Sequence, residues 1–226
     1  MSHKRYAIYY APRPSDLARA TASWLGWDVE TGSVAQPLEG MPRFPPEVTE
    51  APRKYGFHGT LKAPFRLAPG RTLQELGDAV SRLAATLAPL SLPAMDLSRL
   101  GGFVALTPRS DAGALNALAA RVVQDLDPFR AALTQADIAR RRPEGLSVRQ
   151  RRHLEVWGYP HVLDEFRFHL TLTGDLSPAQ AEPVIQALAD WLMPRVPVPF
   201  PIQDLCLFGE DDEGKFHLLC RHALTG

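Results

Sequence analysis

The sequence predicts an α+β protein with two lobes of antiparallel sheet, related by a pseudo-twofold axis around a central cleft, with helices on the outside. The main observation is an internal echo, in which a strand, a helix and two further strands follow one another within 58–107 and again within 169–222. A second observation is that no glycine-rich phosphate loop opens a series of βαβ units. This argues against a doubly wound nucleotide-binding fold.

Local patterns predict each element of the first quarter of the chain. The aromatic and β-branched run at 5–10 predicts a strand. Apolar residues at helical spacing predict a helix over 15–25, with Ser15 as N-cap and Gly26 as the stop. The proline-rich stretch at 29–52 shows little periodicity and predicts a long loop.

The two repeats are predicted by hydrophobic periodicity and by capping residues. Thr72 and Glu75 form the capping box of the helix in the first repeat, and Ser177-Pro178 opens the helix in the second. The expected strands are 57–67, 91–97, 102–107, 166–174, 202–208 and 216–222, and the expected helices are 72–87, 111–126 and 177–192.

We expect these elements to form a single bilobal domain over 1–226. Its lobe-like repeats would span about 55–108 and 166–223. Between them, a polar and arginine-rich segment at about 128–160 predicts a helical insertion.

Composition narrows the class of protein. Lys plus Arg and Asp plus Glu are 25 each, so the formal net charge is zero, which argues against a DNA-binding protein that contacts many phosphates. The two cysteines, Cys206 and Cys220, form no zinc-binding pattern. No apolar run is long enough for a membrane span, and the N-terminal residues lack a signal-peptide pattern, so we expect a cytoplasmic protein.

Two His-x-Thr-Leu motifs are the candidate catalytic feature. They are His58-Gly59-Thr60-Leu61 and His169-Leu170-Thr171-Leu172, which begin 111 residues apart. Because residues i and i+2 of a strand point to the same face, each threonine lies beside its histidine and each leucine points into a core.

Such a pair of histidines suits acid–base chemistry on a phosphoester. Imidazole titrates near neutral pH, so one ring can accept a proton and the other can donate one. The hydroxyls of Thr60 and Thr171 can donate hydrogen bonds to phosphoryl oxygens as charge develops. This chemistry needs no metal and no cofactor, and residues alone do not decide which histidine is the acid.

The paired motifs resemble those of the 2H phosphoesterase superfamily. More narrowly, RYAIYYAP, YGFHGTLKAPFRL, LGGFVAL, DPFRA and WGYPHVLDEFRFHLTLTG resemble a bacterial branch of DUF1045-like proteins associated with phosphonate metabolism, over nearly the whole chain. The resemblance implies a bilobal fold and metal-independent chemistry on a cyclic or other small phosphodiester. His58, Thr60, His169 and Thr171 match the catalytic motifs, and a cyclic ribose phosphate is the implied substrate.

Further side chains are candidates for substrate binding because of their place beside the motifs. Cations on the expected catalytic faces could contact the phosphate, and nearby aromatic rings could stack on a sugar or base. These candidates are Lys62, Arg167, Tyr55, Tyr159 and Tyr6.

Two other functions are compatible with the same residues. A binding protein could hold a phosphorylated metabolite or an RNA end without turnover, although binding alone needs no paired proton donor and acceptor. A metal hydrolase could use His58, His169 and an acid such as Asp164, but the spacings typical of such sites are absent. The oligomeric state has no signal in the sequence.

Overall fold

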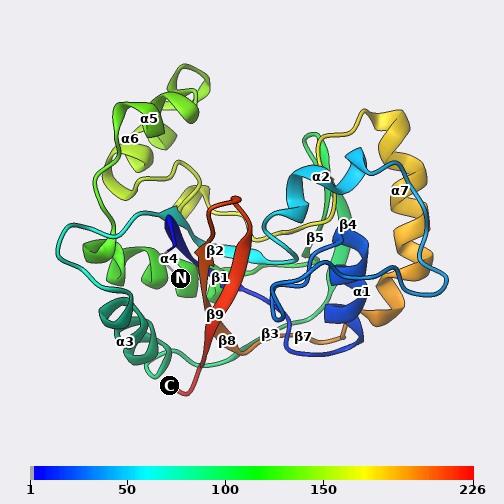
Figure 1. The fold of residues 1–226 in the computed structure, drawn as a ribbon, viewed down its shortest axis with the longest axis horizontal. Helices are drawn as coiled ribbons and strands as arrows, with labels where there is room; N and C mark the ends of the chain where they lie inside the picture. Colours follow the sequence, from blue (N-terminus) through cyan, green and yellow to red (C-terminus); the bar gives the residue numbers. More distant parts are fainter. Residues whose placement is uncertain (1–2) are drawn as a thin grey trace.

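The computed structural model describes residues 3–226, which fold around one antiparallel seven-stranded sheet (Figure 1). Its strand order is β4-β5-β6-β2-β1-β8-β9, and β3 pairs separately with β7. The strands are β1 (Arg5–Tyr10), β2 (Gly59–Phe65), β3 (Leu90–Leu92), β4 (Met95–Leu100), β5 (Phe103–Pro108), β6 (Leu170–Thr171), β7 (Phe200–Ile202), β8 (Asp204–Glu210) and β9 (Phe216–Ala223).

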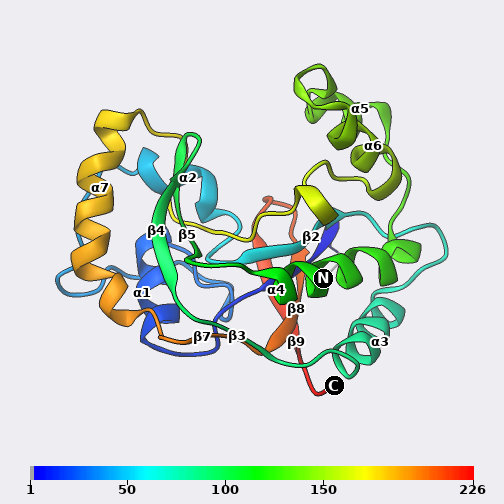
Figure 2. The ribbon, with the colours of Figure 1, turned by 180° about the vertical axis from the view of Figure 1, so that it is seen from behind.

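The helices lie outside this sheet, as Figures 1 and 2 show from opposite sides. On one half, α3 (Leu73–Ala84) packs against β8 and β9, and α4 (Gly113–Asp125) packs against β2. On the other half, α7 (Pro178–Trp191) packs against β4 and β5. The remaining helices are α1 (Asp16–Leu25), α2 (Glu47–Arg53), α5 (Gln135–Arg140) and α6 (Val148–Trp157), with short 3-10 turns η1 (Asp127–Phe129), η2 (Pro143–Gly145), η3 (Leu163–Glu165) and η4 (Met193–Arg195).

The predicted α+β class is confirmed, and the echo in the sequence reappears in the element order. The series β2-α3-β3-β4-β5 is repeated as β6-α7-β7-β8-β9. However, the hairpin β4-β5 of the first series pairs with β6 of the second, and β2 of the first lies on the side of the hairpin β8-β9. Each half of the sheet therefore combines one repeat's histidine strand with the other repeat's hairpin.

Some boundaries differ from those expected from the sequence. The stretch expected as a loop over 29–52 contains α2 near its end. The second motif strand, β6, is much shorter than 166–174, and just after it two backbone groups have side-chain partners. The indole of Trp24 donates to the carbonyl of Leu172 (2.8 Å), and the hydroxyl of Thr173 accepts from the amide of Val104 (2.9 Å).

Hydrophobic alternation positions the two motif strands as predicted. Phe57 just before β2 and Leu61 on it are buried in the large core beneath the helices, and so are Leu170 on β6 and Leu172 just after it. The histidines and threonines between them therefore face the opposite side of the sheet.

None of the helices within residues 3–226 is both long and apolar enough to cross a membrane.

Gly59 allows the two motif strands to approach each other. It pairs with Leu170, and a Cβ at Gly59 would lie 2.4 Å from Cε2 of Phe168. Phe168 is buried and its ring occupies the space that a side chain would need. This contact explains why the first motif has glycine where the second has leucine.

We predict that Gly59→Ala destabilises the protein by about 1–3 kcal/mol, because the buried ring of Phe168 has to move. Gly77→Ala is the matched control, since a Cβ there meets nothing within 4 Å and alanine favours the interior of α3, so stability should rise by up to about 1 kcal/mol. Urea unfolding of both variants measures the difference. Equal stability of the two variants would contradict this account of Gly59.

Candidate functional site

The pairing of β2 with β6 brings the two His-x-Thr-Leu motifs together. Gly59 pairs with Leu170 in antiparallel register. Continued by one residue on each side, this register puts His58 opposite Thr171 and Thr60 opposite His169. Side chains directly opposite each other have Cβ atoms about 5 Å apart. The four residues therefore form one group on a single face of the sheet, with a local twofold relation through the Gly59–Leu170 pair.

Each of the two imidazoles is held by a hydrogen bond of the same kind. Nδ1 of His58 lies 2.9 Å from the carbonyl oxygen of Gly56, and Nδ1 of His169 lies 2.7 Å from the carbonyl oxygen of Arg167. A carbonyl can only accept, so each Nδ1 carries the hydrogen and donates it. In a neutral ring this leaves Nε2 as the nitrogen that can accept a proton.

An aromatic ring from a neighbouring strand packs against each histidine. Tyr9 on β1 lies against His58, with ring centroids 4.0 Å apart. Phe103 on β5 lies against His169, with centroids 5.4 Å apart. These contacts extend the local twofold relation to β1 and β5, the outer neighbours of the two motif strands.

The surroundings of His58 favour its neutral form. Burial lowers the pKa of His58 to about 4, and the nearby charge of His169 acts in the same direction. The hydrogen bond to the carbonyl of Gly56 opposes this shift without reversing it. At neutral pH the ring of His58 is therefore unprotonated at Nε2.

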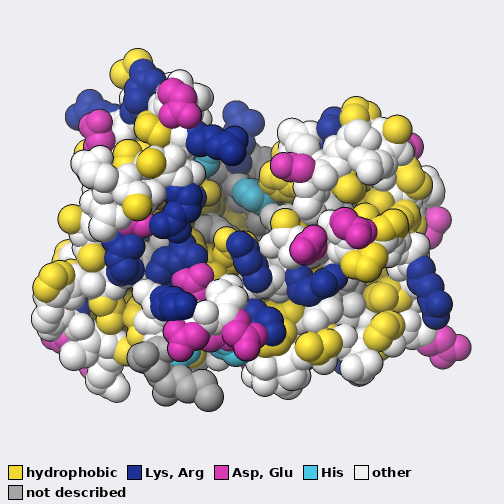
Figure 3. Space-filling view, turned by 45° about the horizontal axis from the view of Figure 1, so that its top comes forward, with side chains coloured by type: hydrophobic (Ala, Val, Ile, Leu, Met, Phe, Trp, Pro, Cys, Tyr) yellow, Lys and Arg dark blue, Asp and Glu magenta, His cyan; other side chains and the backbone are white. Residues whose placement is uncertain are grey.

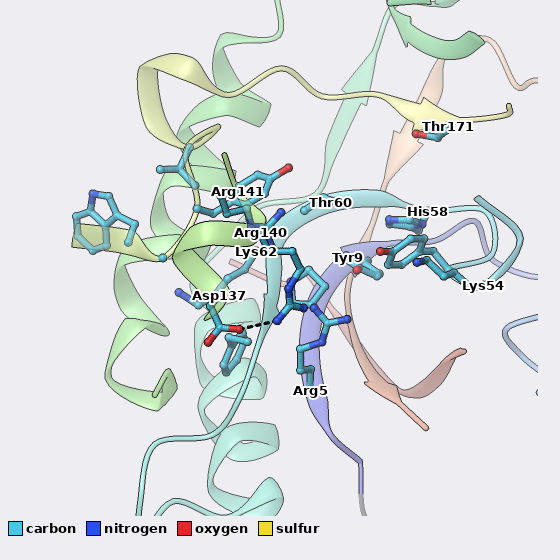
Figure 4. Close-up of a pocket in the computed structure, with 18 of the residues that line it drawn as sticks. Arg5, Tyr9, Lys54, His58, Thr60, Lys62, Asp137, Arg140, Arg141 and Thr171 are labelled. Carbon is cyan, nitrogen blue, oxygen red and sulfur yellow. Dashed lines mark hydrogen bonds and ion pairs between the residues drawn. The ribbon is translucent and has the colours of Figure 1, made fainter. Parts of the chain in front are cut away.

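A cavity of about 490 Å³ lies over this face of the sheet. His58, Thr60, Thr171, Tyr9 and Phe103 line it. Figure 3 shows the molecule hollowed between its halves, with histidine side chains at the hollow and Lys and Arg side chains gathered along one flank. The close-up in Figure 4 shows His58 and Thr171 toward one end of the cavity and several cations toward the other. His169 is not among the lining side chains, but the ring of Phe103 connects it to the wall.

Lys62 lines the cavity, yet its ammonium is already engaged. Nζ donates to the carbonyl of Val123 (3.0 Å) and to Oδ1 of Asp127 (3.2 Å). Burial lowers the pKa of Lys62 to about 8, and Asp127 limits the shift. The residue thus ties β2 to the end of α4 while it contributes positive charge to the cavity wall.

Two predicted substrate-binding side chains lie away from the cavity. The side chain of Arg167 is exposed and does not line the wall; its backbone carbonyl is the part that serves the site, as the acceptor for His169. Tyr6 is buried in the core beneath the helices. Because β1 alternates, Tyr9 and not Tyr6 faces the cavity, and the prediction for Tyr6 was wrong.

The other two aromatic candidates do line the cavity. The ring of Tyr55 stacks on Phe216, with centroids 5.0 Å apart, and lies 5.7 Å from the ring of His58. Tyr159 also lines the cavity, and the guanidinium carbon of Arg141 lies over its ring, 4.8 Å from the ring centroid. Burial raises the pKa of Tyr159, so its hydroxyl keeps its proton.

The sequence did not identify Tyr9, Phe103, Arg140 or Arg141 as site residues. The first two need the strand order, because only sheet pairing puts them beside the histidines. The arginine run at 140–142 is compatible in sequence with a solvated helical face or, alternatively, with one mouth of the cleft that attracts an anionic substrate. In the structure Arg140 and Arg141 line the cavity.

Asp164, the acid considered for a metal site, has other partners. Its carboxylate lies 2.6 Å from Arg149 and 3.2 Å from Nε2 of His153. Over residues 3–226, no three His, Cys, Asp or Glu side chains are grouped so that they could hold a metal ion.

Comparison with known proteins gives two curated relatives, both named "Ribose 1,5-bisphosphate phosphokinase PhnN". The relative from Janthinobacterium sp. (strain Marseille) is 37% identical over 185 residues, which cover 80% of this chain and 41% of the relative. The relative from Laribacter hongkongensis (strain HLHK9) is 31% identical over 231 residues, which cover 96% of this chain and 51% of the relative. The chain spans about half the length of the curated relatives it matches.

Comparison with solved structures gives matches that cover the full length of both chains. A structure titled "Crystal structure of phosphoesterase" is 20% identical with a TM-score of 0.48. Escherichia coli LigT complexed with 3'-AMP is 19% identical with a TM-score of 0.47.

The family described as "Protein of unknown function (DUF1045)" matches residues 60–217, which contain most of the first motif strand, the whole second motif and the arginine-rich segment between them. This match confirms the narrower resemblance drawn from the motifs. The chain belongs to the DUF1045 family.

Proposed function

We propose that this chain is a metal-independent phosphoesterase that opens a small, cyclic phosphodiester. The observation that supports this most is the Gly59–Leu170 register, which puts each motif's histidine opposite the other motif's threonine. Two imidazoles and two hydroxyls on one face suit a phosphoryl group with an entering and a leaving oxygen on opposite sides.

The two histidines take different roles in this proposal. His58, whose Nε2 is unprotonated at neutral pH, accepts a proton from the attacking water. The water oxygen bonds to phosphorus, the bond from phosphorus to the leaving oxygen breaks, and His169, as the general acid, donates a proton to that oxygen. Thr60 and Thr171 donate hydrogen bonds to the nonbridging oxygens.

The names of the curated relatives support a cyclic ribose phosphate as the substrate, and a role in phosphonate metabolism. Ribose 1,5-bisphosphate carries a phosphomonoester on C1. Opening a phosphodiester ring that joins O1 and O2 of ribose 5-phosphate leaves such a group on O1 when the bond from phosphorus to O2 breaks and O2 takes the proton. The proposed reaction would therefore supply the compound in the relatives' name.

We predict that His58→Ala and His169→Ala each lower kcat by roughly 10²- to 10⁴-fold on a cyclic ribose phosphate, because each removes a proton-transfer group. His222→Ala is the control, since His222 does not line the cavity and should leave turnover unchanged. EDTA should not alter the rate of the wild type. Full turnover by both motif variants, on a substrate that the wild type cleaves, would refute the proposal.

The lowered pKa of His58 also predicts a pH dependence of stability. The unfolded chain takes up a proton near pH 6.5, whereas the folded protein resists protonation of His58 until about pH 4. Stability should therefore be lost as the pH falls from 6.5 to 4, by about 3 kcal/mol from this residue. Urea unfolding at several pH values should show this loss in the wild type and a smaller loss in His58→Gln. Parallel curves would contradict the neutral state of His58 in the folded protein.

A further inference from the structure

The cavity has a cationic end, away from His58 and Thr171 (Figure 4). Two strands and the arginine-rich helical segment contribute to it, so it combines distant parts of the chain. The side chains that define this cationic end are Arg5, Lys62, Arg66, Arg130, Arg140 and Arg141, and all six line the cavity.

Acidic partners balance only part of this charge. Asp127 is shared by Lys62 and Arg130, with distances of 3.2 and 2.8 Å. Asp137 is likewise shared by Arg66 and Arg140, at 2.6 and 2.9 Å.

Glu210 pairs with Arg5, whereas no carboxylate within residues 3–226 lies within 4.0 Å of the guanidinium of Arg141. Six cations therefore have three carboxylates between them. The cationic end therefore has three more positive charges than carboxylates to balance them, in a protein whose formal net charge is zero.

Asp137 fixes the two arginines that share it. Its carboxylate accepts from the backbone amide and the hydroxyl of Thr134, as the capping box of α5. It also accepts two hydrogen bonds from the Arg66 guanidinium, 3.2 and 2.6 Å long. These bonds hold the pKa of Asp137 well below its usual range, so it stays ionised while it positions Arg66 and Arg140.

Arg141 is the cation most available to a ligand. Its guanidinium lies over the ring of Tyr159, which orients it through a cation–π contact and leaves its hydrogen-bond donors free of carboxylates. A planar guanidinium held in this way suits bidentate binding of a phosphate. Arg141 can bind a phosphate without losing an ion pair, whereas Arg66 would have to give up its ion pair with Asp137.

The near edge of the cationic end lies at a distance from Thr60 that suits a sugar. It begins at Lys62, two residues along β2 from Thr60, which is about 7 Å at the usual strand rise. A compound bound by Thr60 at one phosphoryl group would therefore extend along β2 toward the arginines. A phosphodiester carries one negative charge and a phosphomonoester about 1.5–2 at pH 7, close to the three unbalanced positive charges.

We propose that the cationic end binds a terminal phosphomonoester of the substrate, and that the substrate class is a sugar that carries both a cyclic phosphodiester and a second phosphate. The inference rests on the proposed function for the identity of the group at the histidines. The binding of the second phosphate itself depends only on the arginines.

The test compares hydrolysis of ribose 1,2-cyclic phosphate with and without a 5-phosphate. In the wild type, kcat/KM should favour the compound that has the 5-phosphate. Arg141→Met should lower this preference by roughly 10- to 100-fold, the effect of losing a charged hydrogen bond. Arg141→Lys should lower it less, because the charge remains but the bidentate geometry is lost.

Arg152→Met is the matched control, since Arg152 comes from the same helical segment, is exposed and does not line the cavity. It should leave the preference of the wild type unchanged. The proposal is overturned if Arg141→Met keeps the wild-type preference, or if Arg152→Met lowers it as much.

Calorimetric binding of ribose 5-phosphate and of ribose separates this proposal from the proposed function. Wild-type protein should bind ribose 5-phosphate more tightly than ribose, and Arg141→Met should lose that difference. If neither cyclic compound is hydrolysed, the proposed function fails, while this binding difference still supports the subsite. Equal binding of the two sugars would overturn the subsite, whatever the enzyme activity.

Discussion

The pairing of Gly59 with Leu170 is the contact on which the rest of the site depends. It is the register pair that joins β2 to β6 at the centre of the sheet. A side chain at Gly59 would meet the ring of Phe168, so a residue without Cβ is needed for the strands to come this close. Once they do, antiparallel register brings two motifs from distant parts of the chain into one group.

The same backbone also orients the reactive groups. Each motif histidine donates from Nδ1 to the carbonyl of the residue two positions before it, which fixes the ring and leaves Nε2 for chemistry. The neighbouring strands then give each histidine a different environment. Tyr9 packs closely on His58, whose pKa is lowered by burial, whereas Phe103 is farther from His169. A nearly symmetric arrangement can thus support unequal roles.

The positive charge of this protein is concentrated at the cavity. The chain as a whole is neutral, but the cavity gathers cations from β1, β2 and the arginine-rich segment around a few shared carboxylates. A buried or half-buried set of charges is screened less by salt than an exposed one, so it attracts a small anion more strongly than the net charge suggests. The zero net charge argues against binding a long polymer of nucleic acid and is compatible with a small phosphorylated compound.

The sequence by itself determined the local structure and the reactive motifs. Strand alternation put each threonine beside its histidine with the leucines in the core, and capping residues such as Thr72 with Glu75 marked the helix ends. These features depend only on neighbouring residues, so a single sequence reveals them.

The tertiary structure decided which segments meet. The strand order places Tyr9 and Phe103 beside the two histidines. Tyr6 lies on the face of β1 that packs into the core, so it is not part of the site. The fold puts Arg141 of the helical segment at the cavity wall, whereas Arg167 is exposed and lies away from the cavity. Pairing and packing bring together residues far apart in the chain, and local spacing carries no information about such contacts.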